Sequence, residues 1–338
     1  MKRRNEVYDL MKGIAIFLIM LCHLVYYEDD IVNRFVCSFH VPLFFILSGF
    51  FSKDIFKISE FIQYTKNNFR RLILPYIVTM LILCVWGAFR AVLKNDMSFI
   101  MVPFLSMISA SADCWYTKWG LAFPGPLWFI VALFLIKEFF GVLQYTLRNI
   151  NIKYRDASLF AISILLSVFY VFVRPKINFP LPFCLGQAIT AMSFYAVGWF
   201  FKRHSLPIWI CVLCIICWPL SIMYGKIILA ACIIEYYPLS FMGACGGTLI
   251  VYYVCKKIHE YFSDIIVVKS IRQMISWCGL YSLPILCMHH LEMYSSIIYS
   301  LQCRIPQIQY LIGWGEIFIA ILLAAVVIKI PGLKNVYI

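Results

Sequence analysis

The chain has 338 residues, of which 63% are hydrophobic and only 13% are charged. A soluble domain carries roughly 25% charged residues, so this composition excludes an ordinary soluble globule and indicates a membrane protein. The formal net charge of +13 does not indicate nucleic-acid binding, because Lys and Arg lie in short clusters between apolar segments, as the positive-inside rule predicts. We therefore expect an all-α polytopic membrane protein, with residues 1–338 as one membrane-embedded domain and no nucleic-acid partner.

Apolar segments of about 20 residues, long enough to cross a bilayer, recur along the chain. If they alternate in direction, most of the 29 basic residues fall on one side, which places both termini in the cytoplasm. The first segment is long enough to span and lacks a small-residue cleavage site, so we expect it to be retained. We expect a bundle of about ten transmembrane helices near residues 11–27, 35–52, 72–93, 127–147, 157–173, 188–201, 207–224, 239–255, 274–291 and 311–330.

Two stretches between these segments have no clear assignment. Residues 225–240 are either an external loop or a deeper segment, so an eleventh span stays open. Residues 94–126 contain an apolar run at 99–108 and a Pro-rich aromatic end, and are too interrupted to span. We expect this stretch to fold back as a lid or a re-entrant element.

Most of the 14 cysteines lie inside apolar segments, where thiols behave as small hydrophobic groups, so we expect no essential disulfide. Cys211, Cys214 and Cys217 have spacings that imitate a metal site. They share a wholly apolar helix with no fourth ligand in sequence, so we interpret them as packing residues and expect no metal site.

The first apolar segment contains three polar residues that a simple anchor would not need: Asp9, Lys12 and His23. A helix turns by about 100° per residue, so Lys12 and His23 point within about 20° of each other, and His23 lies roughly 16 Å deeper. Ionisable residues at such depth are functional candidates, although a neutral His that joins two helices by a hydrogen bond is the structural alternative. Asp9 is roughly 21 Å from His23 along the helix, so we expect it to orient Lys12 or the helix start.

The second segment enters the bilayer from the opposite side, which places His40 near the depth of His23. The two histidines are therefore predicted to face one cavity. Ser48 lacks the flanking pattern of a catalytic nucleophile, and the Ser48-Gly49 pair is more typical of a close helix contact.

Arg70 and Arg71 directly precede the third apolar segment, on the cytoplasmic side. Guanidinium groups pair bidentately with phosphate, so these residues are candidates for binding a phosphorylated ligand. The alternative is contact with anionic lipid.

Several segments, in this order along almost the whole chain, resemble the integral-membrane acyltransferase family 3, in particular its fucose 4-O-acetylase-like branch. The Arg-x-x-Arg pattern of that family is not met, because Asn68 stands three residues before Arg71. The segments that carry the resemblance are Asp9–Ile14, His23, Phe39–Gly49, Arg71–Tyr76, Pro126–Ile130, Phe194–Gly198 and Ser282–His289.

This resemblance implies a single membrane-embedded acyltransferase domain over residues 1–338. Such an enzyme moves an acyl group, usually acetyl, from cytoplasmic acyl-CoA to a hydroxyl of an envelope carbohydrate or lipid-linked sugar. It implies acetyl-CoA or another acyl-CoA as donor substrate, no permanently bound cofactor, a carbohydrate or glycolipid acceptor, and a multi-pass position in the lipid bilayer of the plasma (inner) membrane. His23 matches the essential histidine of the family, whereas Lys12, Arg70 and Arg71 fall at its donor-binding basic positions.

His23 then acts either as a general base on the acceptor hydroxyl or as a nucleophile that carries the acyl group transiently. The sequence leaves both routes open, together with the question of whether the chain forms a homo-oligomer. Each acceptor-side candidate has an ordinary structural alternative, such as anchoring at the membrane interface for a tryptophan. These candidates are His40, Trp128, Arg174, His289 and Glu292.

Two other functions fit a polytopic chain with buried polar residues. A transporter of a small polar solute or lipid-linked sugar would show two related halves and paired broken helices, which the sequence does not reveal. A scaffold subunit of an envelope-polymer complex would tolerate replacement of His23.

Overall fold

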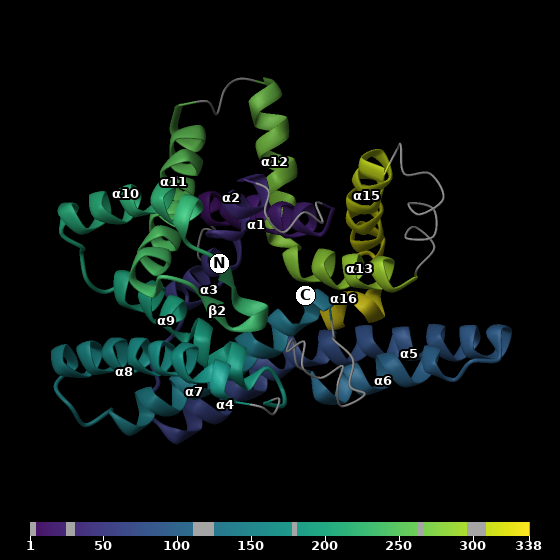
Figure 1. Ribbon diagram of the computed structural model, residues 1–338, viewed down its shortest axis with the longest axis horizontal. Helices are drawn as coiled ribbons and strands as arrows, with labels where there is room; N and C mark the ends of the chain where they lie inside the picture. The colour runs from purple at the N-terminus through teal and green to yellow at the C-terminus, as the bar shows by residue number, and fades with distance from the viewer. Residues whose placement is uncertain are drawn as a thin grey trace.

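The computed structural model describes residues 5–24, 31–110, 125–177, 181–261, 266–295 and 309–337, and these are predominantly helical (Figure 1). The prediction of an all-α membrane protein is therefore confirmed at the level of fold class. The α-helices are α1 (Glu6–Leu24), α2 (Ile31–Cys37), α3 (His40–Phe50), α4 (Ile58–Asn68), α5 (Leu74–Lys94), α6 (Ser98–Ser109), α7 (Trp128–Thr146), α8 (Ile152–Val173), α9 (Leu185–Phe201), α10 (Ile208–Tyr224), α11 (Tyr237–Tyr261), α12 (Ile266–Leu280), α13 (Ser282–Ser295), α15 (Gln309–Val327) and α16 (Pro331–Tyr337). Short elements between them are the π-helix η1 (Phe69–Ile73), the 3₁₀ turns η3 (Gly125–Leu127), η4 (Arg174–Lys176) and η5 (Leu229–Ala231), and the strands β1 (Ile227–Ile228) and β2 (Ile233–Ile234).

Five helical stretches of the described chain are long and apolar enough to cross a membrane. A sixth results if Gly313–Val327 and Pro331–Tyr337, which are bent by 113° relative to each other, form one span. The helices run in two main directions, since α11, α12 and α15 run up the view of Figure 1, whereas α5, α6 and α8 run across it. Ten spans and cytoplasmic termini thus stay predictions. The five stretches are Ile31–Phe50, Ile58–Lys94, Gly125–Thr146, Ile152–Lys176 and Tyr237–Tyr261.

The predicted span 274–291 is wrong as a single helix, because the chain breaks at Tyr281 into α12 and α13. Pro284 lies in the first turn of α13, where a missing N–H is tolerated, but it could not continue a helix from α12. Figure 1 shows α12 upright and α13 lying across its end. The break allows α13 to reach the same region as the C-terminal half of α1, against which it packs.

The two unassigned stretches also take definite forms. Residues 227–234 form a short antiparallel hairpin with η5 at its turn, and α11 then begins at Tyr237, so this part of 225–240 is not an eleventh span. In the other stretch, α6 folds back along α5, and a Cβ added to Gly87 would lie 2.1 Å from a backbone oxygen of α6. The Pro-rich aromatic part at 111–124 lies outside the described residues.

Glycines allow two helix pairs around the functional region to approach at backbone distance. A Cβ on Gly49 would lie 1.9 Å from a carbonyl oxygen of α9, and one on Gly198 would lie 1.7 Å from a carbonyl oxygen of α3. The prediction of a close helix contact at Ser48-Gly49 is confirmed. Helices α1 and α12 approach equally closely. A Cβ on Gly13 would lie 1.9 Å from a carbonyl oxygen of α12, and one on Gly279 would lie 1.7 Å from a carbonyl oxygen of α1. These contacts fix the relative positions of α1, α3 and their neighbours.

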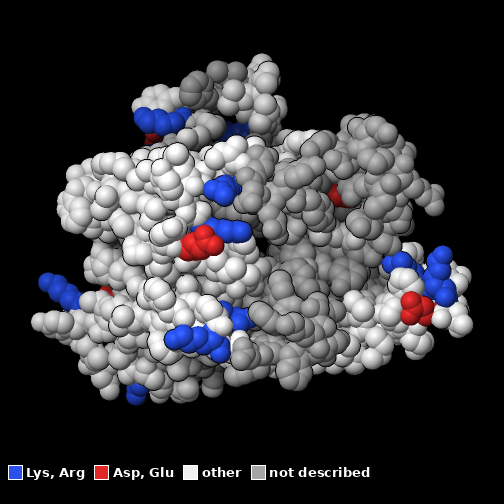
Figure 2. Space-filling view, in the orientation of Figure 1, with Lys and Arg blue, Asp and Glu red and all other residues white. Residues whose placement is uncertain are grey.

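A network of charged side chains joins the loop after α3 to the start of α8 and the end of α9. Arg155 is buried, and its Nη2 lies 3.2 Å from Asp54 Oδ1 and 3.4 Å from Asp156 Oδ1. Arg203 Nη2 lies 2.7 Å from Asp54 Oδ1, and His204 Nε2 lies 3.1 Å from Asp156 Oδ2. On the face drawn in Figure 2, the Lys, Arg, Asp and Glu residues that the structure describes are scattered and do not form one patch.

Candidate functional site

A cavity of about 610 Å³ opens between α1, α3, α7, α13 and the π-helix η1. Three basic residues from three different elements line it, namely Lys12, Arg71 and Lys137, together with the polar side chains of Ser48 and Asn68. The described lining includes no carboxylate. We call this space the basic cavity. Its charge suits an anionic ligand such as a phosphate.

Lys12 is held at the basic cavity from two sides. Its Nζ lies 3.9 Å from Asp9 Oδ1, one turn earlier on α1, and 5.4 Å from the centroid of the Phe51 ring. Asp9 itself is buried. Asp9 is expected to orient Lys12 or the helix start, and this contact with Lys12 is compatible with the first of these roles.

The π-helix η1 carries Arg70 and Arg71, which differ in their position relative to the basic cavity. Both side chains are exposed, but Arg71 lines the basic cavity and Arg70 is not part of its lining. A π-turn holds one more residue than an α-turn and changes the direction of the side chains that follow, and such turns are frequent at functional sites. The sequence predicted a pair of equivalent arginines, but the structure brings only Arg71 together with Lys12.

Asn68, at the position where the family pattern has Arg, is buried and lines the basic cavity beside Arg71. Its Nδ2 donates a hydrogen bond to Glu138 Oε1 at 2.9 Å, and Thr65 donates to the other carboxylate oxygen. Glu138 is therefore engaged with α4. Its neighbour Lys137 lines the cavity.

Sequence reasoning missed Lys137 as a site residue. The signal was present, because Lys137 lies within the predicted apolar segment 127–147, and an ionisable group there is a functional candidate by default. Its Nζ lies 5.3 Å from the centroid of the Tyr64 ring, so an aromatic side chain of α4 supports the ammonium group.

A second, smaller cavity of about 170 Å³ adjoins the first. Cys22, His23, Cys37, His40 and Trp128 contribute to its lining, and we call it the histidine cavity. Three apolar side chains line both cavities and form the boundary between them: Ile19, Phe129 and Leu286.

One face of α1 runs past both cavities. Lys12, Ile16 and Ile19 line the basic cavity, and Ile19 and His23 line the histidine cavity. The predicted stripe that joins Lys12 to His23 is thus present in an unbroken helix. At the boundary, the Phe129 ring packs at 4.9 Å from the ring of Phe45 on α3.

Four of the six histidines of the chain gather around the end of this stripe. His23 is half-buried, and its ring centroid lies 5.5 Å from that of His289, which is fully buried on α13. His290 is also buried, and a Cβ on Gly125 would lie 2.6 Å from its ring. His40 lies across the same cavity, with Nδ1 2.6 Å from the carbonyl oxygen of Val36.

The chain matches the family described as an acyltransferase domain over residues 5–330. It belongs to acyltransferase family 3. This membership makes the protein a membrane acyltransferase, from a family that generally acetylates carbohydrates. No curated protein and no solved structure matches the chain. The fucose 4-O-acetylase-like branch stays a prediction.

The structure of this acyltransferase brings together three of the acceptor-side candidates. His40 and Trp128 line the histidine cavity, and His289 contacts His23. Arg174 instead lines a separate cavity of about 930 Å³ and donates a hydrogen bond to the carbonyl oxygen of Ile177 at 3.1 Å. The side chain of Glu292 lies outside the described residues.

The β1–β2 hairpin separates the histidine cavity from the cavity that Arg174 lines. Leu229 and Ala230 of η5 line the histidine cavity, whereas Ala231 and the residues of β2 line the cavity of Arg174. This division could not be predicted, because an apolar run with Gly and Lys at its start indicates neither a hairpin nor its position.

Proposed function

We propose that this chain is an O-acetyltransferase that moves the acetyl group of cytoplasmic acetyl-CoA to a hydroxyl of an envelope carbohydrate or lipid-linked sugar at the plasma (inner) membrane. The observation that carries the proposal is that one face of α1 connects the basic cavity at Lys12 with the histidine cavity at His23. A donor with phosphates at one end and a thioester at the other requires both environments.

The basic cavity supports binding of the donor phosphates. Lys12, Arg71 and Lys137 supply cationic groups from α1, η1 and α7 without a competing carboxylate in the described lining. Charge-assisted hydrogen bonds to phosphate are about twice as strong as neutral ones. The linear arm of CoA would then follow Ile16 and Ile19 and pass Phe129 towards His23.

His23 supports two chemical routes. As a general base, it accepts the proton of the acceptor hydroxyl while that oxygen attacks the thioester carbonyl, and CoA leaves as a thiolate that the imidazolium can protonate. As a nucleophile, it takes the acyl group from the thioester and passes its ring proton to the departing CoA thiolate, and the acceptor hydroxyl then attacks the acyl-imidazole and gives its proton to the freed imidazole. His40, Trp128 and His289 are placed to orient the acceptor.

Calorimetry of acetyl-CoA with the detergent-purified protein tests the donor half of the proposal. We expect the Arg71→Ala, Lys137→Ala double variant to lose binding, and Lys66→Ala to bind as the wild type does, because Lys66 is exposed on α4 and does not line the basic cavity. Turnover of radiolabelled acetyl-CoA on membranes that contain candidate glycans tests the acceptor half. If the folded protein binds no acyl-CoA and moves a solute across vesicle membranes, the proposed function is wrong and the protein is a transporter.

A further inference from the structure

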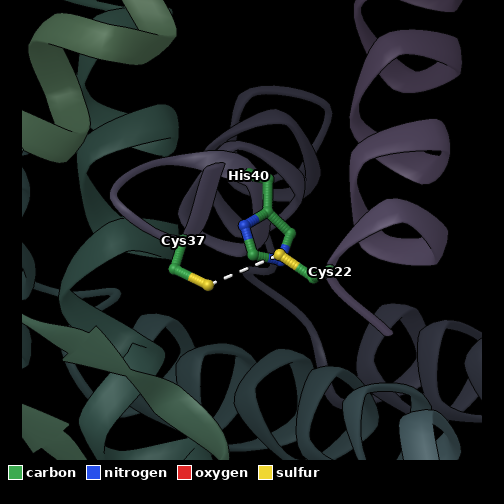
Figure 3. A group of neighbouring side chains, drawn as sticks. All are labelled: Cys22, Cys37 and His40. Atoms are coloured by element: carbon green, nitrogen blue, oxygen red, sulfur yellow. Dashed lines mark hydrogen bonds between the residues drawn. The ribbon is translucent and has the colours of Figure 1, made fainter. Parts of the chain in front are cut away.

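Three metal-ligating side chains meet where α1 ends and α2 passes into α3 (Figure 3). Cys22 belongs to the last turns of α1, Cys37 ends α2, and His40 begins α3. Their ligand atoms all lie within 4.8 Å of one another, and among the described residues this is the one such group of three His, Cys, Asp or Glu side chains. We propose that Cys22, Cys37 and His40 bind a thiophilic divalent cation of the zinc class.

The separation of the two sulfur atoms fits a tetrahedral metal site. Zinc binds thiolate sulfur at about 2.3 Å and imidazole nitrogen at about 2.0 Å, so two sulfur ligands are about 3.8 Å apart. Cys22 Sγ and Cys37 Sγ lie 3.4 Å apart, within a few tenths of an ångström of that separation. Rotation of the two thiols, with a closer approach of the His40 ring whose ligand atom lies within 4.8 Å of both sulfur atoms, would complete the coordination.

His40 is already oriented as a metal ligand. Its Nδ1 lies 2.6 Å from the carbonyl oxygen of Val36, so Nδ1–H donates and the lone pair stays on Nε2. Figure 3 shows the ring turned towards the two sulfur atoms. A metal-bound histidine almost always donates its second ring N–H in this way, which fixes the tautomer and the ring orientation.

Asn33 completes the surroundings of the two thiols. Its Oδ1 accepts a hydrogen bond from Cys37 Sγ at 3.0 Å and lies 3.6 Å from Cys22 Sγ. On binding, both thiols release their protons to solvent, and Asn33 Oδ1 or a water molecule can take the fourth position. Two thiolates and a neutral imidazole around a divalent ion form a site of zero net charge, which suits its half-buried position.

The chemistry of the ligands also decides which cations are excluded. Sulfur and imidazole nitrogen favour zinc and related ions, whereas magnesium and calcium require oxygen ligands. The site is reached from a cavity of about 130 Å³ that Asn33, Cys37 and Lys226 help to line. This inference does not depend on the proposed acetyl transfer, since binding of the ion requires neither acyl-CoA nor acceptor.

Cobalt(II) titration of the reduced, full-length protein in detergent tests the proposal. We expect one equivalent of cobalt to give the thiolate-to-cobalt absorption and the visible bands of tetrahedral coordination, and zinc to abolish both. Cys22→Ser, Cys37→Ser and His40→Ala should each weaken binding by more than about tenfold. Cys211→Ser is the matched control, because Cys211 is a half-buried cysteine on α10 outside the cluster.

A second measurement needs no variant and therefore does not depend on whether a variant folds. Zinc should protect Cys22 and Cys37 of the wild-type protein from alkylation, as mapped by mass spectrometry, while Cys211 reacts at an unchanged rate. Magnesium at the same concentration should protect neither. Absence of the cobalt–thiolate absorption in wild-type protein with both thiols free, or equal alkylation with and without zinc, overturns the proposal.

Discussion

The imidazole rings of His23 on α1 and His289 on α13 lie with their centroids 5.5 Å apart, inclined by 43°. This contact exists because the chain breaks at Tyr281, which turns α13 across the end of α12 (Figure 1). A continuous helix over 274–291 would carry His289 along the direction of α12. The histidine cluster is therefore a product of the helix break.

The contact predicts that His289 positions His23. His289→Ala should lower kcat of acetyl transfer by about tenfold, because the buried ring no longer limits the orientation of His23, and leave the Kd for acetyl-CoA unchanged. Steady-state kinetics and calorimetry on the same preparation provide both values. His259→Ala is the control, since His259 lies at the end of α11 beside Glu6. An equal loss of kcat in the two variants would contradict a specific role of His289.

Arg70 and Arg71 are predicted to contribute differently to the affinity for acetyl-CoA. Arg71→Ala should weaken acetyl-CoA binding by about tenfold, the value of one charge-assisted contact of about 1.4 kcal/mol. Arg70→Ala should weaken it less, because Arg70 does not line the basic cavity. Calorimetry at low and high salt measures the difference. Equal losses, or a larger loss for Arg70, would contradict the assignment of Arg71 rather than Arg70 to the basic cavity.

The close approach of α3 and α9 predicts strong sensitivity at its glycines. Gly198→Ala places a Cβ 1.7 Å from a carbonyl oxygen of α3, so the helices must move apart at a cost of about 1–3 kcal/mol. Thermal unfolding of the protein in detergent should show a clear fall in Tm. Gly315→Ala is the matched control, because nothing lies within 4 Å of a Cβ at that position. Equal Tm values for the two variants would refute the packing argument.

The network around Arg155 predicts a second sensitive position, away from both cavities. Arg155→Met removes the cation between Asp54 and the buried Asp156, so stability should fall by about 3 kcal/mol. Lys153→Met, on the exposed start of α8, provides the comparison. Denaturation of both variants in the same detergent checks this expectation, and a loss in Lys153→Met as large as that in Arg155→Met would count against it.

Helical periodicity sufficed to predict the arrangement along α1. Lys12 and His23 lie on one face of a single helix, and both line the predicted functional region. Apolar length likewise located most helices. Such features depend on residues within a single helix, so they can be predicted from the sequence alone.

The features that the sequence did not reveal depend on contacts between distant segments or on local irregularities. The π-helix over Phe69–Ile73 is one such irregularity, because nothing in these residues distinguishes it from an α-turn. Cys22 and Cys37 lie 3.4 Å apart, and no spacing motif in the sequence indicates this contact. Arg174 faces a different cavity from His23, because an unforeseen hairpin stands between them.

The most direct test of the central claim compares wild type with His23→Ala in acetyl-CoA binding and in acetyl transfer on the same purified samples. Lys12 and Arg71 line a cavity that does not include His23, so the variant should bind acetyl-CoA as the wild type does. Its turnover should fall by about 10²- to 10⁴-fold, the contribution typical of a positioned acid–base group. Undiminished turnover in His23→Ala would contradict the account.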